Sequence, residues 1–325
     1  MISSTPPASR SGLCEGGHQA ALGKTLQEMK RRAYLKTMLA GAGSLALPAL
    51  ASEPLAERIR HTDPGKYQLS RSHHGAGEMA CQRLLSSDAL TTNFFFIDRC
   101  RIMPHGGVGH HFHNRCEEMF IIFDGEAQFT IDGRTSVLKG PAGAPCRMGH
   151  SHAIYNPSSE PVEFMNINVS AVKGKYDAFN LDDPRVGVPL DPIPVFMTLR
   201  FDKALLKPVA DYLGGQGVAR YRRALHPEIF LTNWSYVDHL LLPSGTSEGR
   251  HRHAGVEEIY YVLDGEGEAQ VNGQRAAIRK GDAVPIRLAE VHSFRAEGSQ
   301  DLELMIIGIA AQKWVLDTEE VNSSH

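Results

Sequence analysis

Two stretches of this 325-residue sequence decide its fold, HFHNRCEE at residues 111–118 and HRHAGVEE at residues 251–258. They lie 140 residues apart, and the same offset brings further parts of the two halves into register. The other matching pairs are residues 92–98 with 232–238, Asp124-Gly125-Glu126 with Asp264-Gly265-Glu266, Asp132-Gly133 with Asn272-Gly273, and His152 with His292. So many matches at a single offset indicate a tandem duplication.

Each half has the composition and spacing of β structure. Short segments rich in β-branched or aromatic residues end at Gly, Asp, Asn or Pro, as at residues 94–103, 118–123, 127–131 and 162–169. Many short strands at this spacing favour a sandwich or barrel over alternating strands and helices. We therefore predict an all-β protein, with one helix candidate at Lys203–Leu213 that Pro208 interrupts.

The repeat also sets the predicted domain organisation. Residues 52–171 form the first domain, residues 201–325 form the second, and the Pro-rich residues 172–200 link them. Residues 1–51 are expected to form a leader and export signal peptide and not a folded domain.

The segment before the first domain has the features of a cleaved export signal. The basic stretch MKRRAYLK at residues 29–36 precedes an uncharged run at residues 37–51 that ends in Ala-Leu-Ala. Its arginine pair resembles the twin-arginine export signal, with Tyr34 where Phe is commoner. The uncharged run is shorter than the ~20 residues that cross a bilayer, so we expect no stable membrane span. We predict a periplasmic or secreted protein; an amphipathic N-terminal helix or a lipid-attached anchor is the alternative.

Composition and charge narrow the class of protein. Apolar residues make up 42% and charged residues 22% of the chain, as in folded soluble proteins, and the formal net charge is −3. No block of like charge is present, so we expect no nucleic-acid partner. Four cysteines follow the leader, and an oxidising compartment permits disulfides. Cys81 and Cys100 flank a turn-like stretch and could pair across a hairpin, whereas free buried thiols are the alternative for these two and for Cys116 and Cys146.

The histidines of the repeat have the spacing of metal ligands. His111 and His113 share a face of a strand, a short loop returns Glu118 to the same point, and His152 closes the set after two further strands. The second half repeats the set as His251, His253, Glu258 and His292. Three imidazoles and one carboxylate suit Mn, Fe, Ni, Cu or Zn and disfavour Ca or Mg. We predict two divalent transition-metal sites, with Mn or Fe preferred, that leave positions open for a substrate.

The spacing around these ligands resembles the two motifs of the cupin family. The first motif is carried by Gly245-(x5)-His251-x-His253-(x4)-Glu258-(x6)-Gly265 and by His111-x-His113-(x4)-Glu118-(x6)-Gly125, and the second by Gly149-(x2)-His152-(x3)-Asn156 and, more loosely, by Gly281 to His292. The resemblance covers about residues 75–170 and 215–310. It implies tandem double-stranded β-helix (jelly-roll) barrels, a bicupin, and allows a homo-oligomer. Arg147 and Arg287 stand where the family usually has Pro, which changes no ligand.

Strand alternation gives expectations for the residues around each metal. Phe120 and Ile122 share the face of Glu118, and Tyr260 and Val262 share the face of Glu258, so we expect fairly apolar cavities that suit an aromatic or enol-type substrate. The alternative is that these side chains are ordinary core.

The glutamates that directly precede the ligand glutamates have the opposite orientation. Glu117 and Glu257 are predicted to point away from the metals, toward the surface or the rim.

The leading functional hypothesis is a dioxygenase-like oxidoreductase that binds a small organic acid or phenolic substrate at Fe or Mn. No catalytic residue can be assigned outside the metal ligands. An oxalate-decarboxylase-like lyase is one alternative, although the chain lacks the His-Trp-His form of the motif and a convincing Ser-Glu-Asn lid. A non-catalytic periplasmic protein that binds metal or a small ligand is the other.

Overall fold

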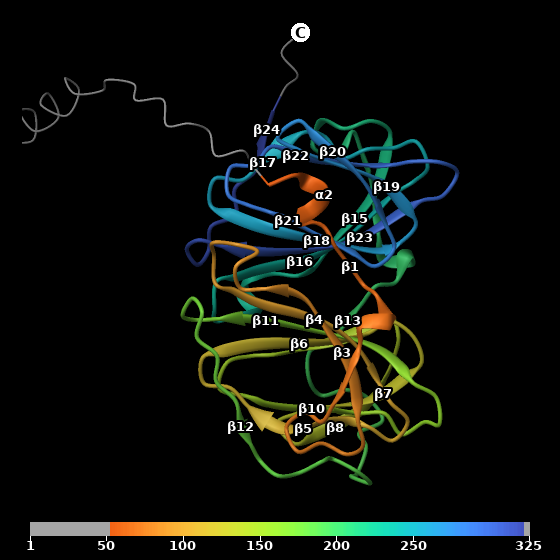
Figure 1. The fold of residues 1–325 in the computed structure, drawn as a ribbon, viewed down its shortest axis with the longest axis vertical. Coiled ribbons are helices and arrows are strands. Elements are labelled where there is room, and N and C mark those ends of the chain that lie inside the picture. Colours follow the sequence, from red (N-terminus) through yellow and green to blue (C-terminus); the bar gives the residue numbers. More distant parts are fainter. Residues whose placement is uncertain (1–52, 322–325) are drawn as a thin grey trace, which may run out of the picture. The chain divides into compact units, whose positions relative to one another are not determined.

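The computed structural model describes residues 53–321, which form almost entirely β structure (Figure 1). The predicted all-β class is therefore confirmed. The predicted export signal at residues 1–51 lies outside the described residues. Within residues 53–321, no helix has the length and apolar character needed to cross a membrane. A single turn of α-helix, α2 (Leu55–Arg58), precedes the strands.

The first barrel is built from a seven-stranded and a five-stranded antiparallel sheet. The larger sheet has the order β13-β9-β6-β11-β4-β3-β2, with bounds Leu199–Arg200, Ala142–Cys146, Cys116–Ile122, Val162–Ser170, Phe94–Ile102, Met79–Ser86 and Gln68–Ser70. The smaller has the order β12-β5-β10-β7-β8, with bounds Phe179–Asn180, Gly107–Phe112, Ser151–Tyr155, Glu126–Ile131 and Arg134–Lys139. Phe120 and Phe164 of the larger sheet and Phe129 and Ile154 of the smaller belong to one buried core between the sheets.

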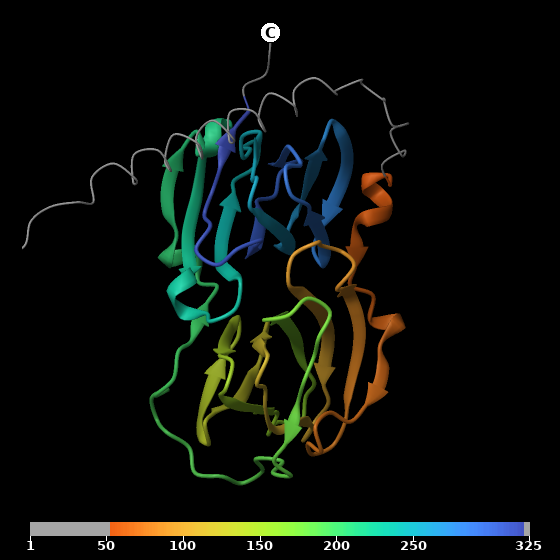
Figure 2. The ribbon, with the colours of Figure 1, turned by 90° about the vertical axis from the view of Figure 1, so that its left-hand side faces the viewer.

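The second barrel repeats this architecture (Figure 2). Its larger sheet has the order β1-β21-β18-β23-β16-β15-β14, with bounds Arg60–His61, Asp282–Ile286, Val256–Asp264, Leu302–Ala310, Trp234–Leu242, Val218–Leu225 and Lys207–Ala210. Its smaller sheet has the order β20-β19-β22-β17-β24, with bounds Gln274–Arg279, Glu266–Val271, His292–Ala296, His251–Arg252 and Glu319–Glu320. The matching strand order confirms the duplication read from the 140-residue offset.

The two barrels share a hydrophobic core. Ile97, Met119 and Ile167 of the first barrel form one buried cluster with Trp234 and Ile259 of the second. These residues alternate with the cavity-facing ones on the same strands, so each larger sheet is buried on both faces. Burial of this apolar surface is the main stabilising term that joins the barrels.

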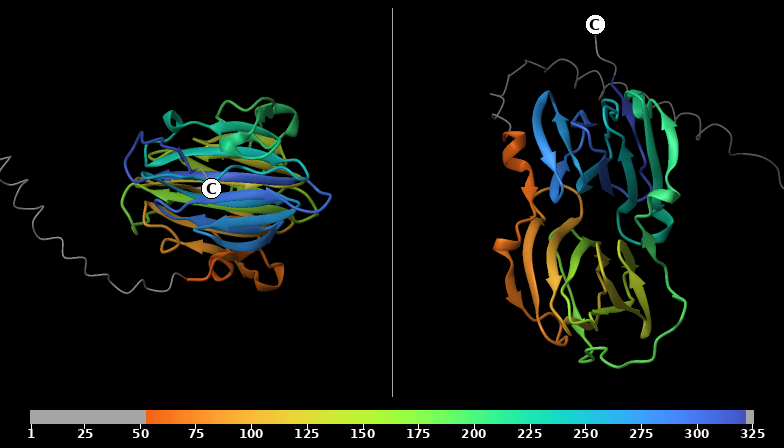
Figure 3. Two further views of the ribbon diagram at one scale, coloured as in Figure 1. Left: turned by 90° about the horizontal axis from the view of Figure 1, so that it is seen from above. Right: turned by 90° about the vertical axis from the view of Figure 1, so that its right-hand side faces the viewer.

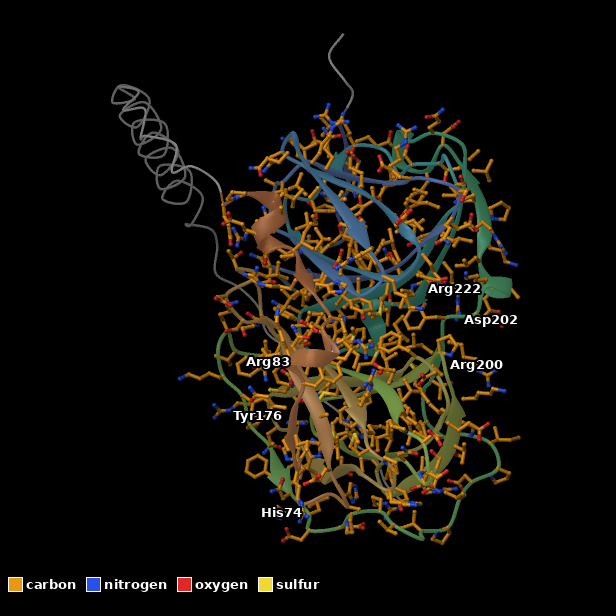
Figure 4. All side chains as sticks on the ribbon, turned by 45° about the vertical axis from the view of Figure 1, so that its right-hand side comes forward. His74, Arg83, Tyr176, Arg200, Asp202 and Arg222 are labelled. Atoms are coloured by element: carbon orange, nitrogen blue, oxygen red, sulfur yellow. A yellow bond between two sulfur atoms is a disulfide. The ribbon has the colours of Figure 1, made fainter. Side chains whose placement is uncertain are left out.

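Each barrel also receives an edge strand from the segment that precedes the other. β1 pairs with β21 of the second barrel, and β13 pairs with β9 of the first. The rest of the segment between the barrels runs along the outside of the first barrel, as the long green loop in Figures 2 and 3 shows. At the boundary between the barrels, Arg222 donates a hydrogen bond to the carbonyl of Arg200 at 3.3 Å (Figure 4).

The prediction of a helix at Lys203–Leu213 is wrong. Residues Lys203–Leu205 and Tyr212–Gly214 form separate 3-10 turns, and the residues between them form strand β14. Pro208 cannot donate a backbone hydrogen bond, which ends a helix but is tolerated on an edge strand such as β14.

The cysteine pair that could meet across a hairpin does so. Cys81 and Cys100 lie directly opposite each other on β3 and β4 and form a disulfide. Cys116 and Cys146 are free and buried.

Candidate metal centres

In the first barrel, the four predicted ligands converge on one buried point. His111 on β5 is the register partner of His152 on β10, and Glu118 projects from β6. The Nε2 atom of His152 lies 3.0 Å from that of His111, 3.4 Å from that of His113 and 3.5 Å from Oε2 of Glu118. All four donor atoms lie within 4.8 Å of one another, so one ion can contact them together.

The second barrel assembles the equivalent group. His251 on β17 is the register partner of His292 on β22, and Glu258 projects from β18. Oε2 of Glu258 lies 3.0 Å from Nε2 of His292 and 3.2 Å from Nε2 of His253. These donors also lie within 4.8 Å of one another. The structure thus brings together all eight residues that the sequence singled out, four in each barrel.

The hydrogen bonds of the histidines determine which nitrogen faces the centre. Nδ1 of five of the six rings lies against a backbone carbonyl, which can only accept, so Nδ1 carries the proton. The pairs are His111 with Gly109 (2.8 Å), His113 with Asp177, His251 with Gly249 (3.0 Å), His253 with Asp317, and His292 with Glu290 (3.0 Å). Each Nε2 then presents a lone pair to the centre. Buried lone pairs pointing at one another repel, and a bound cation removes that cost, so the residues fit a metal ion.

Burial lowers the pKa of three of the six imidazoles and so favours their neutral form. Burial, reinforced by His152, lowers the pKa of His111 to about 2, and burial lowers the pKa of His152 to about 4. Burial and the neighbouring His292 lower the pKa of His251 to about 3. His113 and His253 differ: burial lowers their pKa values, but the adjacent carboxylates of Glu118 and Glu258 outweigh burial. The pKa of His113 is therefore raised, and that of His253 is raised to about 9. A cation entering the second group therefore displaces a proton from His253.

Different residues orient the ligand carboxylate in the two barrels. Asn168 donates its amide hydrogen to Oε1 of Glu118 at 2.7 Å, whereas Tyr236 donates its hydroxyl hydrogen to Oε1 of Glu258 at 2.7 Å. The repeat partner of Asn168 is Gly308, where an added Cβ would lie 2.3 Å from the Tyr236 ring. The second barrel thus has no side chain on β23 where β11 carries the Asn168 amide, and a phenol on the neighbouring strand β16 takes its place.

Aspartates after each barrel hold the loop between the ligands. Asp177 accepts hydrogen bonds from the backbone N–H groups of Asn114 (3.2 Å) and Arg115 (3.1 Å), and Asp317 accepts them from Ala254 (2.5 Å) and Gly255 (2.9 Å). Neither aspartate was predicted, although the two lie at the 140-residue offset and could have been found by it.

Around the first metal group, aromatic rings cover the ligands. The ring of His73 stacks on His111 with centroids 3.7 Å apart, and its Nδ1 bonds Oδ1 of Asn180 at 2.7 Å. Phe120 stacks on His152 with centroids 4.2 Å apart. The expected aromatic neighbour is present here, but His73 was not predicted, because nothing in its local sequence places it over the ligands.

Around the second metal group, the expectation of a fairly apolar cavity is wrong. A cavity of about 220 Å³ reaches the ligands and is lined by Tyr212, Tyr236, Tyr260 and Glu248. The hydroxyl of Tyr260 lies 3.2 Å from Oε1 of Glu248 and 3.4 Å from Nε2 of His292. Glu248 precedes β17 on a segment outside the named strands, so alternation along β18 could not reveal it; burial raises the pKa of this carboxyl group well above its usual range.

Glu117 and Glu257 point away from the metals, as predicted, but their predicted place at the surface or rim is wrong. Both are fully buried at the boundary between the barrels. Glu117 accepts hydrogen bonds from Leu231 and Thr232, and Glu257 accepts them from Thr91 and Thr92. The face opposite the metal is covered by the other barrel, which alternation within one strand does not reveal.

The fold and these two groups define a β protein made of two jelly-roll barrels, each with a His/Glu metal-binding group. The profile of the cupin domain matches residues 98–168 and 239–308. The chain is therefore a two-domain member of the cupin family, a bicupin, as its motifs predicted.

Two curated proteins match about one barrel's length of this chain. The "Oxalate-binding protein" of Thermotoga maritima is 32% identical over 111 residues, which cover 34% of this chain and 92% of that protein. An uncharacterized protein of Methanocaldococcus jannaschii is 26% identical over 109 residues, which cover 34% of this chain and 86% of that protein.

Three solved structures with the same fold are named as enzymes. Oxalate decarboxylase from Lactobacillus farciminis, in a formate complex, superposes with a TM-score of 0.57 at 13% identity over 81% of this chain and 88% of that one. A mutant of the Bacillus subtilis oxalate decarboxylase gives 0.56 at 14% identity over 81% and 79%. Salicylate 1,2-dioxygenase from Pseudaminobacter salicylatoxidans gives 0.54 at 13% identity over 69% and 74%. At these identities the likeness concerns the fold.

Proposed function

We propose that this protein is an exported, metal-dependent enzyme that binds a small organic acid or phenolic compound directly to Mn or Fe. The observation that supports it most is the convergence of three imidazole lone pairs and one carboxylate in each barrel. Four such donors leave positions on a six-coordinate ion for a substrate. A bound Mn or Fe ion supplies Lewis-acid activation and redox chemistry.

The protein's own residues orient and shield this site. The carbonyls of Gly249, Glu290 and Asp317 fix the three histidine rings of the second barrel, and Tyr236 fixes the Glu258 carboxylate. Burial of the ligands excludes bulk water from the coordination sphere. Hydrogen-bond partners of this kind orient the ligands and tune the affinity of the site for its metal.

We assign substrate turnover to the second barrel. Its ligands His251, His253 and Glu258 open to a cavity of about 220 Å³, a size suited to a small molecule. In the first barrel, His73 stacks on the ligand His111. That group then serves chiefly to hold an ion and stabilise the fold.

Export forms part of the proposal. The basic and uncharged stretches at residues 29–51 have the pattern of a cleaved signal. The disulfide between Cys81 and Cys100 supports an oxidising compartment, because such bonds are rare in the cytosol. Fractionation of cells producing the full chain tests it, and retention of the uncleaved protein in the cytosol would contradict it.

Oxalate chemistry is the second candidate, and one comparison favours it. The Thermotoga relative at 32% identity is named for oxalate binding. One reaction panel separates the two candidates. The Mn- or Fe-loaded protein is offered catechols, 2-hydroxy acids and oxalate while O2 uptake and CO2 release are recorded. Consumption of a catechol or hydroxy acid supports our proposal, CO2 release from oxalate supports a lyase, and ligand binding without turnover supports a binding protein. Glu258→Gln is the control that removes the proposed reactive ion.

A further inference from the structure

Glu248 is a buried carboxyl group beside the second metal group, and none of the roles assigned above uses it. Its side chain is buried (2% exposed) on the segment between β16 and β17. Oε1 accepts a hydrogen bond from the Tyr260 hydroxyl and lies 4.0 Å from Nε2 of His251. Oε2 has no hydrogen-bond partner among residues 53–321.

The repeat shows that this carboxyl group belongs to the second barrel alone. At the 140-residue offset, Glu248 corresponds to Val108 and Tyr260 corresponds to Phe120. Val108 and Phe120 are both part of the apolar core of the first barrel. The same fold and the same metal ligands are therefore built without a carboxyl group at this position.

Glu248 shares a cavity with the second metal group. The residue lines the cavity of about 220 Å³ together with the metal ligands His251, His253 and Glu258. A buried carboxyl oxygen without a partner costs free energy, and such groups in native proteins call for a specific explanation. A ligand coordinated at the metal and bonded to Oε2 provides one.

We propose that Glu248 is a positioning residue that recognises the hydroxyl group of a ligand bound at the second metal group. A hydroxyl group whose oxygen coordinates the metal keeps its hydrogen, which it can donate to the free carboxylate oxygen of Glu248. A second carboxylate, as in oxalate, offers acceptors only. Within the proposed function, on which this inference rests, the substrate class is a 2-hydroxy acid or a catechol-type phenol and not a dicarboxylate.

Glu248→Gln tests this assignment with ligands of matched size. Glycolate and oxalate both carry two carbons and chelating oxygens, but only glycolate has a hydroxyl hydrogen; catechol serves as the uncharged probe. With Tyr260 donating to the amide oxygen, the amide nitrogen faces the cavity and replaces an acceptor by a donor. We expect glycolate and catechol to bind roughly tenfold to a hundredfold more weakly and oxalate to bind more tightly.

Dissociation constants are measured from the Mn(II) electron paramagnetic resonance signal of the full-length protein in the Glu118→Gln background, so that only the second ion reports. Glu126→Gln, an exposed carboxylate on β7, is the matched control and leaves all three constants unchanged. Equal Mn(II) content and an equal thermal midpoint in Glu248→Gln and Glu126→Gln establish that the fold persists. A further variant, Tyr260→Phe, retains the preference for glycolate because Oε2 of Glu248 is kept.

Three results would overturn the inference. If glycolate and oxalate both bind more tightly to Glu248→Gln than to the wild type, the substitution acts through charge alone and no hydroxyl group is recognised. If none of the three probes perturbs the second ion in the wild-type cavity, Glu248 positions no such ligand. Turnover of an acid or phenol in the reaction panel with unchanged Glu248→Gln selectivity removes this inference and leaves the proposed function standing.

Discussion

Glu117 and Thr232 join the two barrels: the Glu117 carboxylate accepts hydrogen bonds from the backbone N–H of Thr232 at 2.8 Å and from its hydroxyl at 2.6 Å. The reciprocal contact runs from Thr92 to Glu257 at 2.6 Å. Each glutamate directly precedes a metal-binding glutamate, Glu118 or Glu258. The strand that carries a ligand in one barrel is thus anchored to a loop of the other.

Removal of this anchor destabilises the whole two-barrel unit. Glu117→Ala leaves the buried N–H groups of Leu231 and Thr232 without their acceptor, and we expect a loss of about 2–4 kcal/mol in the free energy of unfolding. Urea denaturation followed by far-UV circular dichroism measures it. The exposed Glu126→Ala change is the comparison and costs less than about 0.5 kcal/mol. Equal effects from the two changes would show that Glu117 carries no structural role.

The orienting residues are expected to act on one ion each. Tyr236→Phe removes the hydroxyl that holds Glu258, and Asn168→Ala removes the amide that holds Glu118. We expect each change to lower the affinity for the ion of its own barrel by roughly 10- to 100-fold and to leave the affinity for the other ion unchanged. Competition with a metal chelator measures both affinities, and a change that weakens both ions equally would contradict separate orientation.

Metal binding in the second barrel is expected to depend on pH through His253. Its pKa is raised to about 9 by Glu258 despite burial, so at pH 7 the ring is protonated and must lose a proton before it binds a cation. The affinity therefore rises as the pH increases from 7 toward 9 and levels off above it.

Calorimetry in buffers of different ionisation enthalpy counts the protons released. In the Glu118→Gln protein, we expect about one proton to leave per Mn(II) bound at pH 7 and close to none at pH 10. Binding at pH 7 without proton release would mean that His253 is already neutral.

The disulfide is expected to stabilise the first barrel. Cys81 and Cys100 are 19 residues apart, and closing a loop of this size contributes about 3 kcal/mol. Cys81→Ser/Cys100→Ser is compared with the oxidised and the reduced wild type by urea denaturation. The double variant and the reduced protein should match each other and fall below the oxidised protein; three equal curves would show that the bond is not formed in solution.

Much of this structure could be predicted from one offset in the sequence. The HxH pairs, Glu118, Glu258 and the distant His152 and His292 recur at the same spacing, and duplication makes that spacing far more informative than one copy. The turn between Cys81 and Cys100 made them candidate disulfide partners but left free thiols as the alternative.

What failed depended on contacts between elements. Alternation assigned Glu117 to the face away from the metal, but only the packing of the barrels shows that this face is buried. His73 reaches its metal group from a turn and Glu248 from a segment outside the named strands, where no periodicity fixes the direction of a side chain. Within the Lys203–Leu213 segment, Lys207–Ala210 forms the edge strand β14 because the neighbouring strand β15 provides hydrogen-bonding partners.

Metal analysis of the protein recovered from its own compartment tests the central claim most directly. Purified full-length protein is measured by inductively coupled plasma mass spectrometry, beside Glu118→Gln, Glu258→Gln and the double variant, with the exposed Glu126→Gln as the control. We predict about two ions of Mn or Fe per chain in the wild type and in the control, one in each single variant and none in the double variant. Wild-type protein without transition metal, or a double variant that keeps both ions, would contradict the account.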